Sequence, residues 1–273
     1  MRTDIGHRRI RSSERPPVQF ENRGVSVSSS VEPLGREPLV RSVDSPAIND
    51  THQRLLESAV HLFAVRGFHG TGIRDLAAGA NLSSATLYHY MGTKERLLFQ
   101  IMQDALDRLL LAARVIESQS DDVRIRLAGL VRMHVITHAL RRDASNVVDN
   151  QVSALEPDDR MLIIQQRDSY EKFWADAIAE GVAAGFFTVP DQSAARIALL
   201  EMCSGVARWY SVDGRHSPDE IADIHVELAA ALLRGCDGRP TWTEPENHLD
   251  IHSLVEEIWA IRVPDGKANR AVK

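Results

Sequence analysis

The stretch Thr71-Gly-Ile-Arg-Asp-Leu-Ala-Ala-Gly-Ala-Asn-Leu-Ser-Ser-Ala-Thr-Leu-Tyr-His-Tyr-Met-Gly-Thr-Lys94 decides the fold of this chain. It is predicted to form two short helices joined by a tight turn, and one face of the second helix is too polar for a core. Asn81 tolerates the left-handed backbone that such a turn requires, and Ser83 is a suitable N-cap for the second helix. This pattern indicates a helix-turn-helix, whose second helix enters the major groove of DNA. Binding to duplex DNA is therefore the first functional hypothesis.

The predicted second helix presents a polar face beside a small apolar core. The core positions of the motif are Leu76, Ala77, Ala80, Leu82 and Leu87. The exposed positions are Ser84, Ala85, Thr86, Tyr88 and His89. Hydroxyl groups suit phosphates and base edges, and a histidine can reach guanine N7. Because this face has no Arg, Gln or Asn, we expect the shape and deformability of the DNA to carry part of the specificity.

The rest of the chain is predicted to be helical, so the expected fold class is all-α. Residues 1–49 are rich in Pro, Ser and Arg and lack a sustained apolar period, which indicates a disordered N-terminal arm. Residues 50–95 are expected to form the three-helix domain with the helix-turn-helix. Residues 96–235 are expected to form a larger helical domain, and residues 236–273 a tail with at most one short helix.

Two predicted helices, at about 191–210 and 217–234, are apolar on nearly every face. A helix that is buried on one side needs only an apolar stripe, so these helices are expected to have partners on two sides. A second copy of the chain would supply that partner and form a four-helix seam. The alternative is a helix pair buried deeply within one chain.

Charge and composition limit the possible partners and the cellular compartment of the protein. The net charge of −6 alone argues against a nucleic-acid partner, but residues 51–100 carry +2 and residues 101–273 carry −9. Such an asymmetry is expected if only one end faces phosphates. No apolar run is long enough to span a membrane, and the first residues lack the apolar centre of a secretory signal. Two cysteines, Cys203 and Cys236, cannot staple a chain of this size. We expect a cytoplasmic protein with no membrane partner.

Candidate ligand-binding side chains lie behind the motif. Arg167, Tyr170 and Trp174 share one face of a predicted helix, where the rings would stack on a ligand and the arginine would pair with an anionic group. Structural packing explains the same three residues equally well. Met102 and Met202 suit either an adaptable apolar pocket or core filling.

His134 and His138 stand four residues apart on one predicted helix, a spacing that can chelate zinc. No third ligand can be placed from the sequence, and we interpret the pair as satisfied or pocket-lining histidines. The sequence also lacks a Gly-rich phosphate loop, a Ser elbow and a complete metal-ligand cluster. We therefore predict no catalytic residues, no metal site and no cofactor, and we do not expect an enzyme.

The motif resembles the DNA-binding head of the TetR family of transcriptional regulators. The resemblance covers residues 52–98 and rests on Phe63 and Gly67, on Thr71 and Ile73, and on the pattern from Leu76 to Lys94. It implies an all-helical homodimer in which residues 96–235 bind a small effector and form the dimer. It also implies that the DNA contacts include Thr71, Ser83, Ser84, Thr86, Tyr88, His89 and Lys94, with Tyr88 and Lys94 on phosphates. Gly72 departs from the family pattern, because a capping Ser or Thr is usual there.

The rear half is similar to a narrower group of that family, the members that control fatty-acid or sterol breakdown. The similarity lies in Gln166–Trp174, in Glu180–Phe187 and in Gly205–Pro218. It implies a repressor that a small hydrophobic effector, here an acyl-CoA, releases from a near-palindromic operator. On that basis the expected effector-binding residues are Met102, His134, His138, Arg167, Tyr170, Trp174 and Met202. The alternatives are a regulator of an efflux or detoxification gene that responds to a drug-like compound, and a non-specific architectural DNA-binding protein.

Overall fold

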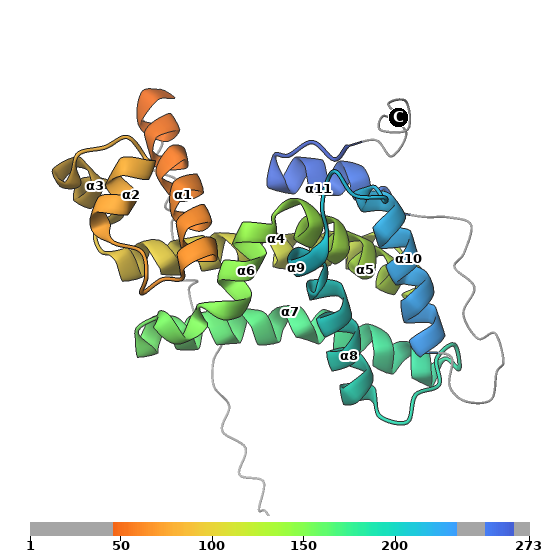
Figure 1. Cartoon of the computed structure of the whole chain (residues 1–273). Helices are drawn as coiled ribbons and strands as arrows, with labels where there is room; N and C mark the ends of the chain where they lie inside the picture. Colours follow the sequence, from red (N-terminus) through yellow and green to blue (C-terminus); the bar gives the residue numbers. More distant parts are fainter. Residues whose placement is uncertain (1–45, 234–248, 265–273) are drawn as a thin grey trace, which may run out of the picture. The chain divides into compact units, whose positions relative to one another are not determined.

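The computed structural model of the chain describes residues 46–233 and 249–264, and these residues form helices and loops without a strand (Figure 1). The first three helices are α1 (Pro46–Arg66), α2 (Ile73–Gly79) and α3 (Ser84–Met91). The all-helical fold class and the helix-turn-helix are thus confirmed. Most of the predicted N-terminal arm, residues 1–45, lies outside the described residues, while Pro46 already begins α1.

Local chemistry fixes the geometry of the three-helix head. Asn81 has a φ of 56°, the left-handed backbone that the turn between α2 and α3 requires. The Ser83 hydroxyl accepts the backbone N–H of Thr86 and caps α3. Apolar side chains of all three helices meet in one core, which includes Leu55, Phe63, Leu76, Leu87 and Met91. The head therefore holds α3 by a cap at its start and by buried side chains along its inner face.

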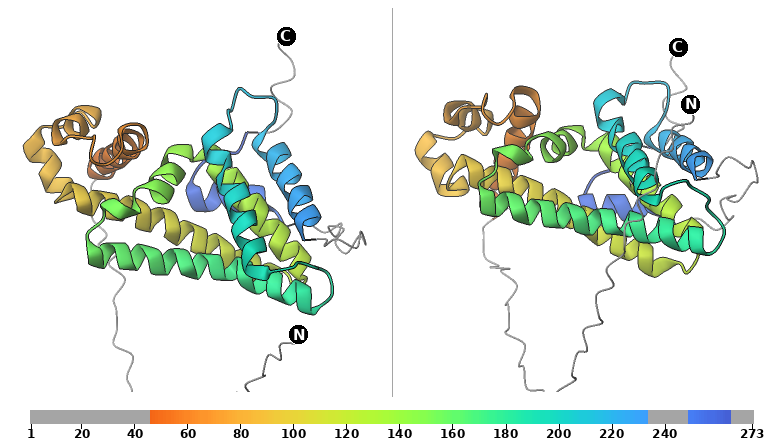
Figure 2. Two further views of the ribbon diagram at one scale, coloured as in Figure 1. Left: turned by 60° about the horizontal axis from the view of Figure 1, so that its bottom comes forward. Right: turned by 90° about the horizontal axis from the view of Figure 1, so that it is seen from below.

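Eight further elements follow the head. They are α4 (Lys94–Gln119), α5 (Val123–Leu140), α6 (Arg142–Asn150), a 3-10 turn (Val152–Ala154), α7 (Pro157–Ala183), α8 (Gln192–Ser204), α9 (Val206–Trp209) and α10 (Pro218–Leu232). A final helix, α11 (Ile251–Trp259), lies within the predicted tail. Figure 2 shows α4 and α7 running side by side, and α10 packs chiefly on α5. Among the described helices, none combines the length and apolar character of a membrane span.

Two segments differ from the sequence prediction. The sequence pattern over residues 143–157 indicates only a weak, loose stretch that ends at Pro157. In the structure this part of the chain contains α6 and a 3-10 turn, and α6 packs on α1, α4 and α9. Arg141 precedes α6 without a side-chain cap, so the usual sequence signal for a helix start is absent. The predicted helix at 191–210 is divided into α8 and α9 at Gly205, a residue that weakens helices.

The helices α8 and α10 keep an apolar face uncovered within one chain. The buried side of α10 includes Ile221, Ala222 and Val226. Large apolar side chains nevertheless stay exposed on α8, α9 and α10, namely Ile197, Trp209, Ile224 and Leu228, with Trp209 at 56% and Leu228 at 47%. These side chains are the second apolar face that the sequence predicts, and residues 46–233 and 249–264 do not bury it.

Candidate DNA-reading head and effector cavity

The outer face of α3 exposes the side chains that the sequence assigned to DNA. Ser84, Thr86, Tyr88 and His89 are exposed, and Tyr88 keeps 51% of its surface. The Thr86 hydroxyl lies 2.8 Å from the Ser83 hydroxyl, so the two groups form one polar pair at the start of the helix. A helix N-terminus with free hydroxyls is suited to phosphate contacts. The tyrosine and histidine further along the helix are available to the groove.

Thr71 occupies a different position from the one expected of a DNA contact. Its side chain is buried, and its hydroxyl donates to the carbonyl oxygens of Gly67 (2.9 Å) and Leu62 (3.2 Å). The hydroxyl is thus turned into the head, where it ties the loop after α1 to the end of that helix. A buried hydroxyl with protein partners is not offered to a phosphate.

Lys94 also makes contacts within the protein. Its ammonium donates to the carbonyls of Phe68 (2.9 Å) and Thr71 (3.0 Å) and lies 4.1 Å from the centre of the Phe68 ring. Two of the three N–H groups are therefore engaged inside the head, and one remains for a phosphate. Lys94 fixes the loop between α1 and α2 from the first residue of α4.

Gly72 offers no side-chain cap to α2, and Asp75 satisfies the N–H of Gly72 instead. Its carboxylate accepts the backbone N–H of Gly72 at 3.0 Å and pairs with Arg66 at 3.1 Å. The hydrogen bond from Gly72, together with Arg66, lowers the pKa of Asp75. The N–H of Gly72 is therefore satisfied, while no side chain at Gly72 caps the first turn of α2. Arg74, which the sequence analysis did not single out, is exposed in the first turn of α2 and is a further cation available to DNA.

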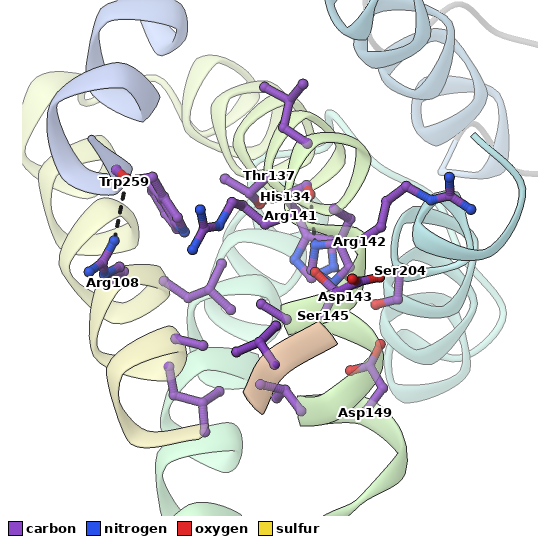
Figure 3. Close-up of a pocket in the computed structure, with 18 of the residues that line it drawn as sticks. Arg108, His134, Thr137, Arg141, Arg142, Asp143, Ser145, Asp149, Ser204 and Trp259 are labelled. Atoms are coloured by element: carbon purple, nitrogen blue, oxygen red, sulfur yellow. Dashed lines mark hydrogen bonds between the residues drawn. The ribbon is translucent and has the colours of Figure 1, made fainter. Parts of the chain in front are cut away.

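A cavity of about 630 Å³ lies behind the head (Figure 3). This volume is in the range of ligand-binding pockets, about 300–1,000 Å³. Its wall is built by α4, α5, α6, α7, α8, α9 and α11, and also by α1 of the head, through Gln53, Leu56, Glu57 and Val60. One helix of the DNA-binding domain therefore belongs to the wall of the cavity.

Two histidines form the buried polar part of the cavity wall. His134 has its Nδ1 2.8 Å from the Tyr170 hydroxyl and its Nε2 3.0 Å from the Ser204 hydroxyl. The ring of His138 stacks on it at 3.8 Å, and His138 Nδ1 donates to the His134 carbonyl. Burial holds the pKa of His134 well below its ordinary value and lowers the pKa of His138 to about 4. Both nitrogens of His134 are engaged by hydroxyl groups, so the pair is not arranged for joint chelation of a metal.

Charged side chains surround these histidines. Asp149 of α6 has its pKa raised to about 6 by burial, against the opposing attraction of Arg167 and Arg208. Glu201, which also lines the cavity, raises it further. Arg142 donates to the carbonyl of Ala207 at 3.0 Å. The part of the cavity near α8 therefore contains arginines and carboxyl groups that partly balance one another.

The structure brings together four of the seven predicted effector residues. His134, His138, Arg167 and Tyr170 line the cavity, whereas Met102, Trp174 and Met202 do not. Trp174 is fully buried behind His134, which it contacts edge to face at 5.6 Å, and Met102 belongs to the core. The cavity also contains arginines and an aromatic ring that sequence reasoning missed, namely Arg108, Arg141 and Trp259. In the sequence Arg108 resembles an ordinary solvent-facing residue of a helix, so no local pattern marks it as a cavity residue.

Polar contacts connect the cavity wall to the head. The Gln151 side chain, just past α6, accepts the backbone N–H of Phe68 at 3.1 Å. On α6 itself, Asp143 lies 2.8 Å from His61 Nδ1 of α1, and Asp143 also lines the cavity. A ligand that displaces α6 would therefore act directly on α1 and on the loop that Lys94 holds.

A three-helix head that contains a helix-turn-helix and whose α1 also lines a ligand-sized cavity is typical of ligand-responsive DNA-binding regulators. Comparison with known proteins agrees. Residues 55–101 match the family described as "Bacterial regulatory proteins, tetR family", and residues 120–233 match "Tetracyclin repressor-like, C-terminal domain". The HTH-type transcriptional repressor KstR2 of Mycobacterium tuberculosis H37Rv is 30% identical over 186 residues, which cover 66% of this chain and 92% of that protein. The chain belongs to the TetR family and is a DNA-binding transcriptional regulator.

Solved structures share the fold. The TetR family regulator PfmR of Thermus thermophilus is 30% identical with a TM-score of 0.60, covering 67% of this chain and 99% of that one. AibR, solved in complex with isovaleryl coenzyme A and operator DNA, has a TM-score of 0.60 at 24% identity and covers 65% of this chain and 97% of its own. At that identity the likeness to AibR shows the fold alone.

Proposed function

We propose that the chain is a repressor that binds a near-palindromic operator as a homodimer and leaves it when an acyl-CoA thioester fills the cavity. The observation that carries this proposal is the shared wall, in which α1 of the head and α6 line one cavity. The repressor named KstR2, to which this chain is similar over 92% of that protein's length, supports the sign of regulation. A regulator of bacterial genes acts on chromosomal DNA, so we place it in the cytoplasm.

The DNA contacts proposed for the head are those that α3 exposes. Tyr88 is expected on a phosphate, with Ser83, Ser84 and Thr86 at the start of the helix, and His89 at a base edge. Lys94 retains one N–H for a phosphate. Thr71 supports the head from inside and is not included among the contacts.

The homodimer is proposed through α8 and α10. Their exposed Ile197, Ile224 and Leu228, with Trp209 of α9, form an apolar face of the kind that soluble proteins cover with a partner. A two-fold dimer through this face would present two heads to two half-sites, so the operator should carry a matching dyad.

Release requires that the ligand prefers the state that does not bind DNA. Two contacts are the route by which a filled cavity would tilt the head: Asp143 on α6 with His61 on α1, and Gln151 just past α6 with Phe68 in the loop after α1. Couplings of this kind change affinity by about 5- to 150-fold. We expect a hydrophobic acyl-CoA to weaken operator binding within that range.

The cavity offers this ligand class both cationic and apolar partners. Arg108, Arg141 and Arg167 line it and would attract a phosphorylated or carboxylated ligand. The apolar part of the lining, which includes Leu106, Leu109 and Leu200, would take an acyl chain. A regulator of an efflux gene remains the second candidate, and it would respond to an uncharged or cationic drug instead.

The operator is found first by selecting bound duplexes from a random pool and testing them against random competitor DNA. A dyad motif with a large specificity ratio is expected, whereas equal binding to random duplex would indicate an architectural protein. The operator complex is then titrated with a panel of acyl-CoAs, with free fatty acids and coenzyme A as controls. Release by a cationic drug and by no thioester would refute the acyl-CoA proposal and leave DNA binding intact.

The proposed route of coupling has its own variant. Gln151→Ala removes the side chain that accepts from Phe68 N–H, so the ligand should still bind but should release the operator less. Gln165→Ala, an exposed position on α7, is the matched control and should leave release unchanged. Full release by the Gln151 variant would show that this contact does not transmit the effect.

A further inference from the structure

The helix α11 completes the cavity from outside the region that matches the family. The family match ends at residue 233, and α11 spans Ile251–Trp259. The Asp250 carboxylate caps the helix by accepting the N–H of Ser253 at 3.0 Å. Its buried side chains, including Leu254 and Val255, pack on α4 and α5. A helix with a cap and a buried face is a fixed part of the wall.

The last residue of α11 connects this helix to the cavity. Trp259 lines the cavity, is only 6% exposed, and its carbonyl accepts from Arg108 Nη1 at 3.4 Å. Figure 3 shows Trp259, Arg108 and Arg141 on one side of the cavity, with Ser204 and Asp149 across from them. Residues that are distant in sequence thus place an indole ring beside two guanidinium groups.

These two guanidinium groups are not neutralised by an ion pair. Other arginines of the same domain are paired, as Arg126 is with Glu180 and Arg132 with Asp223. Within the described residues, neither Arg108 nor Arg141 forms an ion pair. Burial and the neighbouring Arg108 both lower the pKa of Arg141. An unpaired, half-buried guanidinium is costly, so two in one cavity wall are expected to serve an anion that comes from outside.

Two carboxylates lie near this corner, but neither is within ion-pair distance of Arg108 or Arg141. Asp104 of α4 lines the cavity and is attracted by Arg108, but burial raises its pKa and no ion pair joins the two. Glu57 of α1 attracts Arg141 and is exposed. An anion with several charges would compete with both carboxylates for the guanidinium groups.

We propose that Arg108, Arg141 and Trp259 form a subsite for the phosphorylated adenine nucleotide of the effector, with the guanidinium groups on its phosphates and the indole on its base. A planar guanidinium group can bind two phosphate oxygens at once, and the face of an indole ring can stack on a purine base. The acyl chain would then lie along the apolar part of the lining, which includes Leu106, Leu109 and Leu200. This inference rests on the proposed function, because the same cavity takes the thioester.

The test compares two ligands with the same acyl chain, one an acyl-CoA and the other an acyl-pantetheine thioester without the nucleotide. Binding to the full-length protein is measured by titration calorimetry. Arg141→Ala and Trp259→Leu should weaken the acyl-CoA about 10- to 100-fold, the loss expected for charged hydrogen bonds or for a stacked base. The same variants should change binding of the acyl-pantetheine by less than about threefold. Arg114→Ala, at an exposed position of α4, is the control and should change neither.

Conservative variants and a nucleotide alone complete the design. Arg141→Lys and Trp259→Phe keep the charge and the ring, and each should recover part of the affinity for the acyl-CoA. ADP should bind weakly to the wild type and not measurably to Arg141→Ala. Equal weakening of both thioesters would overturn the subsite while leaving the proposed function in place. Binding of ADP with the predicted variant pattern, but no release of operator by any thioester, would uphold the subsite and refute the proposed function. Absence of binding by both ADP and acyl-CoA would overturn the subsite.

Discussion

Replacing Lys94 by alanine should lower the stability of the head and also its affinity for DNA. The ammonium makes two hydrogen bonds, to the carbonyls of Phe68 and Thr71, and lies over the Phe68 ring. A hydrogen bond to a charged group contributes about 1.5–3 kcal/mol and a cation–π contact about 0.5–2 kcal/mol. Because the site is only partly buried and the contributions are not additive, we expect a loss of about 2–4 kcal/mol in the free energy of unfolding.

Urea unfolding followed by circular dichroism measures this loss. Arg74→Ala is the matched control, because Arg74 is exposed and has no partner among the described residues, so its removal should leave stability within about 0.5 kcal/mol. An unchanged unfolding midpoint in Lys94→Ala would refute the structural role. Operator binding is then measured against salt well below the melting temperature, where one lost phosphate contact should reduce the slope by about 0.9. A loss of stability with an unchanged slope would remove Lys94 from the phosphate contacts.

Three further predictions concern the head, the cavity and the dimer. Thr71→Val should cost about 1–3 kcal/mol of stability, since a buried hydroxyl partner is lost, and should leave operator affinity of the folded protein unchanged in a gel-shift assay. Between about pH 4 and 6.5 the two cavity histidines are neutral in the folded protein and charged in the unfolded one, so each takes up a proton on unfolding. Asp149 is protonated in the folded protein and releases a proton on unfolding, so the net effect is an uptake of protons. The free energy of unfolding should therefore fall as the pH is lowered, and Asp149→Asn should steepen that fall by about 1.4 kcal/mol per pH unit near pH 5. Chemical denaturation at several pH values measures this, and a shallower fall in the variant would contradict the raised pKa of Asp149. Leu228→Glu should give a monomer by sedimentation that binds one half-site only weakly, and a variant that stays dimeric would place the interface elsewhere.

Local chemistry made the head predictable from the sequence. Asn81 and Ser83 act on neighbours within a few residues, so their roles as turn and cap follow from residue type alone. The partners of Lys94 lie 23 and 26 residues away, and its contacts within the head depend on how α1 and α4 pack. Thr71 likewise matches a family contact position, but its hydroxyl finds carbonyls that only the folded loop brings near.

The cavity was predictable only in part, because most of its wall is assembled from distant segments. The spacing of four residues places His134 and His138 on one helix face, and the spacing of Arg167 and Tyr170 places these two on one face of α7. Trp259 and Arg108 are 151 residues apart, and no periodic pattern connects them. Trp174 was a reasonable ligand candidate from its position on α7, but packing behind His134 removes it from the cavity wall.

The position of α6 between the cavity and α1 has a consequence for genetics. Substitutions on its two sides should give opposite phenotypes in a reporter strain. Changes at the contacts with the head, such as that of Gln151 with Phe68, should leave target genes silent even with inducer present. A larger side chain at Ser145, in the cavity wall, should displace α6 in the way that a bound ligand would. Such a substitution should switch the target genes on without inducer. Substitutions in α11 should give a third class of mutants, which respond to a different inducer but otherwise regulate their target genes normally. New inducer specificities could therefore be selected by changing α11 alone.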